Sequence, residues 1–153
     1  MPRHKISERS DEEYRAVLRE CASFNLRKAS RVVSQLYDDI LQPTGLRSTQ
    51  VALLVVLAVE RESSMARLAR QLVISPSTLS RNLRPLERDG LVEIRSTGKR
   101  GKSISLTAVG GKALSDAFPY WREAQDKFIE LIGASAWSTL SRQIAKTTSA
   151  ARS

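Results

Sequence analysis

The sequence predicts a mainly α-helical protein with one small β-hairpin, and three observations carry that prediction. Apolar residues recur every three or four positions along most of the 153 residues, which is the period of amphipathic helices. Residues 91–96 and 102–106 instead alternate apolar and polar side chains around a glycine-bounded turn, as the strands of a hairpin do. Directly before them, two short helical patterns are separated by only a few residues. The hydrophobic content of 41% fits a single folded domain.

The N-terminal part of the chain is expected to be helical. Residues 1–10 are polar and are expected to form a loose tail, whereas residues 11–41 follow a helical pattern. This pattern predicts one long helix, or two helices with a break near Asn25. Pro43 ends it, because proline disfavours helix at the residue before it. Since a small domain does not need so long a helix, we expect residues 11–46 to contribute to a dimer interface.

Residues 47–107 are expected to form a compact unit that begins with a central core segment. The run from Val51 to Val59 is apolar on all sides and rich in β-branched residues. Periodicity alone therefore leaves open whether it is a buried strand or a buried helix. Ser48 or Thr49 is expected to cap it if it is a helix.

Residues 64–72 and 75–88 predict two helices joined by a tight turn. Ser64 and Ser75 are good N-caps, and Pro76 occupies a first helical position, where its missing N–H does no harm. The second helix has an apolar stripe and a separate polar, basic face, formed by Leu79, Leu83 and Leu86 and by Ser77, Arg81, Arg84 and Arg88, respectively. Alone, this second pattern fits a solvated surface helix equally well. Followed by the hairpin, it predicts a winged helix-turn-helix whose basic face meets an anionic partner.

The residues after the hairpin predict two closing helices. Thr107 is expected to cap a helix over residues 108–132, which Pro119 would kink or break in its preceding turn. A last helix is expected to begin near Ala134. Because these helices carry both tryptophans outside the winged segment, residues 108–153 are expected to be C-terminal dimerisation helices. The alternative is that their aromatic side chains pack within the subunit.

The charge distribution favours a nucleic-acid partner. The net charge is +9, and residues 61–112 hold eleven basic and four acidic residues, a net charge of +7. The same residues include no aromatic side chain, which argues against a membrane surface as the partner. No apolar run reaches the roughly 18 residues of a spanning helix, and the N-terminus lacks the apolar core of a signal peptide. A cytoplasmic protein is therefore expected.

The inventory of reactive side chains argues against catalysis. The single histidine, His4, lies in the polar N-terminal tail, so no Ser-His-Asp, Cys-His or His-metal arrangement is expected. Neither a glycine-rich phosphate loop nor a CxxC or HExxH pattern occurs. Carboxylate pairs such as Asp38 and Asp39 lie on polar helix faces and are expected to be solvated. No enzyme, cofactor or metal site is predicted.

Residues 68–114 resemble the DNA-binding core of the multiple-antibiotic-resistance repressor (MarR) family of bacterial transcription regulators. They match the pattern LAxxLxxxxSTxSRxLxxLExxGLV, followed by a wing and by SLTxxG at the start of a long helix. With the flanking helices, the resemblance covers residues 21–144. It implies a helix over residues 49–60, a homodimer and a repressor role. It also implies release by a small, often aromatic or phenolic effector bound between the dimer region and the winged domain, whose binding residues the sequence does not identify.

The resemblance also assigns roles to individual side chains. Each recognition helix would enter a major groove of a pseudo-palindromic operator, with half-site centres about 10 base pairs apart. Ser77, Thr78 and Arg81 are expected to read base edges, since arginine offers two donors to guanine. Arg100 at the wing tip is expected to enter the minor groove. The expected phosphate contacts are Arg70, Ser75, Arg84, Arg95, Lys99 and Lys102.

Three positions depart from the family pattern. Gly98 stands where the family wing usually carries an aspartate, so the wing lacks an acidic anchor. Val73 stands where the helix-turn-helix turn often has glycine. Pro85 lies late in the recognition helix, beyond the turns that would read bases.

Two other functions remain open from the sequence. The hydroperoxide-sensing branch of the family uses a cysteine near the start of its first helix. That position falls on Ser23, whereas Cys21 lies two residues earlier and thus about 200° around a helix. The apolar neighbours of Cys21 favour a buried, inert thiol over a redox sensor. The other alternative is a nucleoid-type or RNA-binding protein without sequence preference, which a base-specific footprint would distinguish.

Overall fold

The computed structural model describes residues 8–98 and 101–151. The chain divides into two compact units, residues 1–36 and 37–153, and each is described by itself. The boundary falls inside a helix. The predicted organisation into N-terminal, winged and C-terminal parts stays a prediction.

The first unit contains α1 (Glu8–Glu20) and most of α2 (Ala22–Leu41). The sequence left open one long helix or two helices with a break, and the structure has two helices. The break lies at Cys21 and not near Asn25. The Asn25 amide donates hydrogen bonds to the backbone oxygens of Cys21 and Arg19, at 3.0 and 3.1 Å. Asn25 therefore satisfies carbonyl groups at the break, which explains why the irregularity precedes it.

Helix also begins earlier than predicted, at Glu8 and not at Asp11. The rest of the expected loose tail, residues 1–7, lies outside the described residues.

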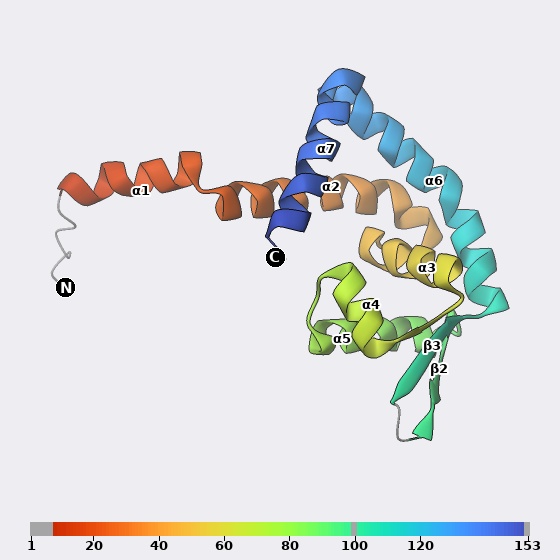
Figure 1. Cartoon of the computed structure of the whole chain (residues 1–153). Helices are drawn as coiled ribbons and strands as arrows, with labels where there is room; N and C mark the ends of the chain where they lie inside the picture. The colour runs from red at the N-terminus through yellow and green to blue at the C-terminus, as the bar shows by residue number, and fades with distance from the viewer. Residues whose placement is uncertain (1–7, 99–100, 152–153) are drawn as a thin grey trace, which may run out of the picture. The chain divides into compact units, whose positions relative to one another are not determined.

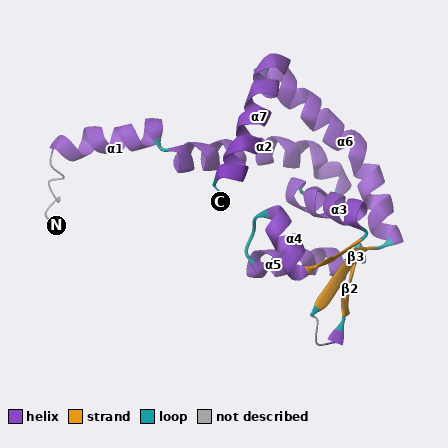
Figure 2. Ribbon diagram, in the orientation of Figure 1, coloured by secondary structure: helices purple, strands orange, loops and turns teal. Residues whose placement is uncertain are grey.

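The second unit is mainly helical with a small sheet (Figures 1 and 2). After the end of α2 its elements are η1 (Gln42–Thr44), α3 (Ser48–Glu60), β1 (Glu62–Ser64), α4 (Met65–Leu72), α5 (Pro76–Arg88), β2 (Val92–Ser96), β3 (Lys102–Leu106), α6 (Ala108–Ile132) and α7 (Ala134–Ala150). The prediction of a mainly helical winged fold is thus confirmed.

The apolar run at the centre of the core is a helix, α3. Its Leu53, Leu54 and Leu57 side chains are at most 1% exposed. The predicted cap was wrong, because Ser48 is already helical and Arg47 is the N-cap residue. Instead, the backbone N–H of Arg47 donates to the Gln50 side chain at 2.9 Å. The Gln50 side chain, in the first turn of α3, thus satisfies the backbone N–H of the N-cap residue.

The caps of the later helices are confirmed. Ser64, Ser75 and Thr107 each accept a backbone N–H three residues ahead, at 3.2, 3.2 and 2.9 Å. Each hydroxyl satisfies one of the donors that a helix start leaves without an intrahelical partner. These caps fix where α4, α5 and α6 begin.

The sheet has three antiparallel strands in the order β1-β3-β2. The predicted hairpin accounts for β2 and β3, and β1 is the additional strand. In the central strand, Ile104 lies opposite Ile94 of β2 and Ser63 of β1. The sequence of β1, Glu62-Ser63-Ser64, has no apolar alternation, which is why the sequence did not indicate a strand. Its pairing joins the end of α3 to the middle of the wing.

The start of α6 packs against Leu91, the residue directly before β2. A Cβ atom built on Gly110 would lie 1.9 Å from the backbone oxygen of Leu91 and 2.8 Å from Cδ1 of Leu106. The same Leu91 oxygen accepts the Thr107 backbone N–H at 3.1 Å. Only a residue without a side chain permits this approach, so Gly110 fixes how α6 leaves the wing.

Pro119 does not break α6, so that part of the prediction was wrong. The helix runs without interruption over its 25 residues, with Pro119 inside. Ser115, whose carbonyl would otherwise accept from residue 119, is exposed, so water can satisfy it. At the other end of α6, Phe128 contacts Trp137 of α7 edge-on, with ring centroids 5.5 Å apart. The two closing helices therefore pack on each other through aromatic side chains.

Candidate nucleic-acid interface

The interface is built on α5, whose two faces have opposite chemistry. Leu79, Leu83 and Leu86 are at most 1% exposed and fix one face in the core. Ser77, Arg81, Arg84 and Arg88 are exposed on the remaining surface. The predicted division of this helix into an apolar and a basic face is what the structure shows.

Three hydroxyl groups gather at the N-terminus of α5. The Oγ atom of Ser75 lies 3.0 Å from Oγ of Ser77 and 2.9 Å from Oγ1 of Thr78. It also accepts the Thr78 backbone N–H. The cap residue thus holds the side chains of Ser77 and Thr78 in place, at the end of a helix where backbone donors favour anions.

The turn before α5 is a strained Schellman motif. The backbone N–H of Ile74 donates to Ala69 at 3.0 Å, and that of Val73 donates to Arg70 at 3.3 Å. Val73 adopts φ 54° and ψ 45°, a left-handed conformation that suits glycine and is unusual for a β-branched residue. The left-handed backbone explains why glycine is common at this position in the family that the sequence resembles.

Arg70 also lies beside this turn. It lines a shallow groove of about 500 Å³ with Ala66, Ala69, Val73, Ile74 and Pro76. The groove lies between the C-terminal half of α4 and the first residue of α5. Arg70 therefore lies near the start of α5, as its expected role requires.

The predicted phosphate-binding cations of the wing differ in their surroundings. Arg95 donates from Nε to Glu93 Oε1 at 2.8 Å, and this hydrogen bond, together with the glutamate charge, raises the pKa of Arg95 above its ordinary value. Lys102 is exposed at the start of β3. Lys99 and Arg100 lie outside the described residues.

A second groove brings the wing next to the start of α4. Its volume is about 520 Å³, and it is lined by Glu62, Ser63, Ser64, Arg67, Thr97, Lys102 and Ser103. Arg67 thus lies on the same groove as Lys102. The sequence did not single out Arg67, because its position depends on the pairing of β1 with β3.

The described residues hold neither a metal site nor a single membrane-spanning helix. Within residues 8–98 and 101–151, no three or more His, Cys, Asp or Glu side chains are arranged to hold a metal ion. In that part of the chain, no single helix is long and apolar enough to cross a membrane. Two consecutive segments with a bend between them, Ala22–Thr44 and Ser48–Glu60, are together long and apolar enough to cross a membrane, by length and composition only.

Comparison with known proteins places this geometry among transcription regulators. A sequence profile described as MarR family matches residues 44–103. Comparison with curated protein sequences gives no match.

The solved structures agree with the profile. The transcriptional regulator MosR of M. tuberculosis is 36% identical, with 88% of this chain and 98% of that chain covered and a TM-score of 0.78. A structure of the same regulator in complex with DNA is 39% identical over 87% and 97% of the two chains, also at a TM-score of 0.78. The fold is shared by a mutant of E. coli MarR complexed with operator DNA, at 18% identity, 86% and 96% coverage and a TM-score of 0.75. The chain therefore belongs to the MarR family of DNA-binding transcriptional regulators.

Proposed function

We propose that this protein is a cytoplasmic, homodimeric repressor that binds a pseudo-palindromic operator and leaves it when a small molecule binds. The observation that carries the proposal is the exposed Ser and Arg face of α5 opposite its buried leucine stripe. A helix of this kind fits the major groove, where base pairs present distinct donor and acceptor patterns. The 39%-identical regulator has been solved with DNA, which supports the same partner here.

Within each subunit, the side chains divide into readers and positioners. Arg81 offers two donors to guanine, while Ser77 and Thr78 contact neighbouring base edges from the hydroxyl cluster. Ser75, Arg70, Arg84 and the cations of the wing hold phosphates; these are Arg95, Lys99 and Lys102, with Arg100 in the minor groove. Arg95 exchanges its Glu93 partner for a phosphate when DNA binds.

The terminal helices supply the dimer contacts in this proposal. In α7, Leu140 and Ile144 are 40% and 44% exposed, four residues apart on one face. In α1, Tyr14 and Leu18 are 60% and 54% exposed at the same spacing. Apolar stripes of this kind, which the single subunit leaves uncovered, are typical of helices that pack against another copy.

Release by an effector follows from population shift. A small molecule lowers operator affinity only if it binds more tightly to an arrangement in which the two recognition helices do not match successive grooves. The residues that contact it are not assigned.

Selection of bound duplexes from a random DNA pool tests the proposal. The expected result is an enriched pseudo-palindrome whose half-site centres lie about 10 base pairs apart and which survives excess random competitor. Enrichment of no sequence, with equal affinity for all duplexes, would instead identify a non-specific nucleic-acid-binding protein.

A further inference from the structure

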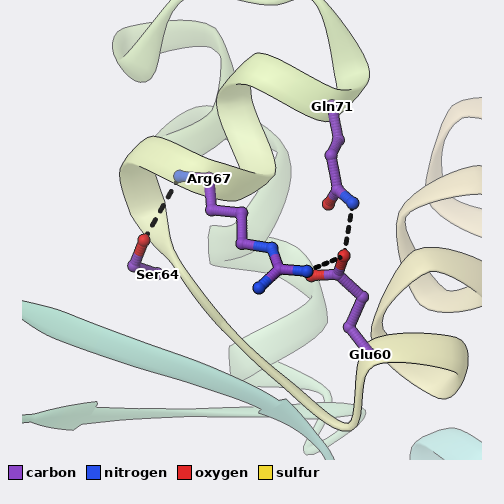
Figure 3. Close-up of polar contacts among 4 residues, drawn as sticks. All are labelled: Glu60, Ser64, Arg67 and Gln71. Atoms are coloured by element: carbon purple, nitrogen blue, oxygen red, sulfur yellow. Dashed lines mark hydrogen bonds and ion pairs between the residues drawn. The ribbon is translucent and has the colours of Figure 1, made fainter.

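The carboxylate of Glu60 joins the core to the first helix of the helix-turn-helix. Glu60 is the last residue of α3, and its side chain is only 10% exposed. Its Oε1 atom accepts hydrogen bonds from Nη2 of Arg67, at 2.8 Å, and from Nε2 of Gln71 (Figure 3). Arg67 and Gln71 are four residues apart on α4 and project from one face of it. One oxygen atom therefore holds two successive turns of α4.

The carboxylate is kept ionised in this position. Burial alone would raise the pKa of Glu60, but the hydrogen bonds from Gln71 and Arg67 and the charge of Arg67 outweigh it, so the pKa lies below its ordinary value. The Arg67 side chain is 60% exposed, and an ion pair open to water on one side contributes little to stability. The Glu60 carboxylate also opposes the binding of a polyanion. Glu60 therefore contributes chiefly through the geometry of its contacts.

The junction that follows Glu60 connects the wing to the same point. Arg61 adopts φ 66° and ψ −45°, a strained conformation for a residue other than glycine. It turns the chain from α3 directly into β1, which pairs with the central strand β3 of the wing. Consequently α3, α4 and the wing meet at Glu60 and Arg61.

Apolar packing decides which face of α4 is buried, and directional contacts add to it. Leu68 and Ala69 are 0% and 5% exposed and hold α4 against the core, but apolar contacts are not directional. The two hydrogen bonds to Glu60 are directional and therefore restrict the rotation of α4 about its axis further. Since only three residues separate α4 from α5, any rotation of α4 is carried to α5.

On the basis of the proposed function, we propose that Glu60 is a positioning residue for sequence recognition. Through Arg67 and Gln71 it sets the orientation of α5 relative to the wing, and so favours operator over random DNA without touching either. A purely electrostatic role instead predicts an unchanged ratio of operator to random affinity, because removing an acidic group beside a basic surface strengthens binding to every sequence.

The test compares three methionine variants, since methionine matches the length of glutamate and glutamine but neither donates nor accepts a strong hydrogen bond. Glu60→Met and Gln71→Met remove the contact from either side. Glu87→Met removes an exposed acidic group of α5 and is the control for charge. For each variant, affinities for the selected operator and for random duplex are measured over a range of salt, with thermal unfolding in parallel.

We expect Glu60→Met to lower the ratio of operator to random affinity about tenfold, the change that follows loss of a hydrogen bond to a charged group. Affinity for random DNA stays equal or increases. Gln71→Met lowers the ratio by a smaller factor at unchanged charge. Glu87→Met strengthens both affinities alike and leaves the ratio unchanged.

Stability and positioning separate in this design. A variant that is merely less folded loses both affinities in proportion and keeps the ratio. An unchanged ratio in both Glu60→Met and Gln71→Met overturns the proposal; if Glu60→Met does not fold, an unchanged ratio in Gln71→Met alone overturns it. A wild-type protein that does not distinguish the operator contradicts the proposed function instead.

Discussion

The winged segment and the terminal helices distribute their apolar residues in opposite ways. In α4 and α5, Leu68, Leu79, Leu83 and Leu86 are at most 1% exposed, so these helices complete a core within one subunit. In α7, by contrast, no residue is buried. The difference indicates two sources of stability. The winged segment should depend on its own packing, whereas the terminal helices should depend on association and therefore on protein concentration.

The largest expected effect is at Gly110, where the start of α6 packs on Leu91 of the winged segment. Gly110→Ala places a Cβ atom 1.9 Å from the Leu91 backbone oxygen, so α6 or the start of β2 must move. We expect a loss of about 3 kcal/mol or more in the free energy of unfolding, at the upper end for overpacking. Urea unfolding of the variant and wild type measures it.

Gly111 provides the matched control. A Cβ atom there meets nothing closer than Leu106 at 3.9 Å. Gly111→Ala should therefore stabilise the helix by about 0.5–1 kcal/mol, the difference in helix propensity. Equal effects at the two glycines would contradict the close approach of α6 to Leu91.

The second effect belongs to the terminal helices. Leu140→Glu places a charge at an apolar position that is 40% exposed in the subunit and is proposed to be covered in the dimer. The dimer dissociation constant should increase about 30-fold, because the charge must lose water on association. Sedimentation equilibrium measures it. Val59→Glu, at a position 78% exposed on α3, should leave the dimer unchanged. Equal dissociation constants for Leu140→Glu and wild type would remove α7 from the interface.

A smaller effect is expected at the turn between α4 and α5. Val73→Gly should stabilise the fold by about 1 kcal/mol, because a left-handed conformation costs a residue with a Cβ roughly 1–2 kcal/mol. Val73→Ala, which keeps the Cβ, should gain less. Thermal unfolding of both variants measures the difference, and a lower melting temperature for Val73→Gly would show that the valine side chain contributes packing that outweighs its strain.

The smallest expected effect is at Cys21. This half-buried thiol lies at the break between α1 and α2, among residues proposed to be covered in the dimer. An apolar environment makes a thiol inert. Cys21→Ser should therefore keep operator affinity and effector release, and mild organic peroxide should leave wild-type binding unchanged. Binding that peroxide abolishes and reductant restores, but only when Cys21 is present, would identify a redox sensor.

The fold could be predicted where local chemistry decides it. Ser64, Ser75 and Thr107 cap their helices through residues three positions away, and the leucine stripe of α5 is visible within one helix. The strand β1 could not be predicted, because its polar residues become a strand only by pairing with a segment about 40 residues later. The break predicted at Pro119 is absent, because the local sequence does not show whether the Ser115 carbonyl, which loses its helical donor, is satisfied in another way.

The same distinction applies to the candidate site. The exposed face of α5, with Ser77 and Arg81, followed from its spacing in the sequence. The contacts of Glu60 with Arg67 and Gln71 did not, because they cross a strand and depend on the unusual backbone of Arg61. Contacts that set the angle between elements leave little periodic signal in any one of them.

The most direct test of the account compares Arg81→Ala with Lys102→Ala on the selected operator and on random duplex. If α5 reads bases while the wing holds the backbone, Arg81→Ala should cost about 1–3 kcal/mol on the operator, relax the preference at one base pair per half-site and leave random binding nearly unchanged. Lys102→Ala should weaken both duplexes alike and reduce the salt slope by about 0.9 per lost phosphate contact. If Arg81→Ala instead weakens random DNA as much as operator DNA, α5 contacts only phosphates and the proposed reading of bases is wrong.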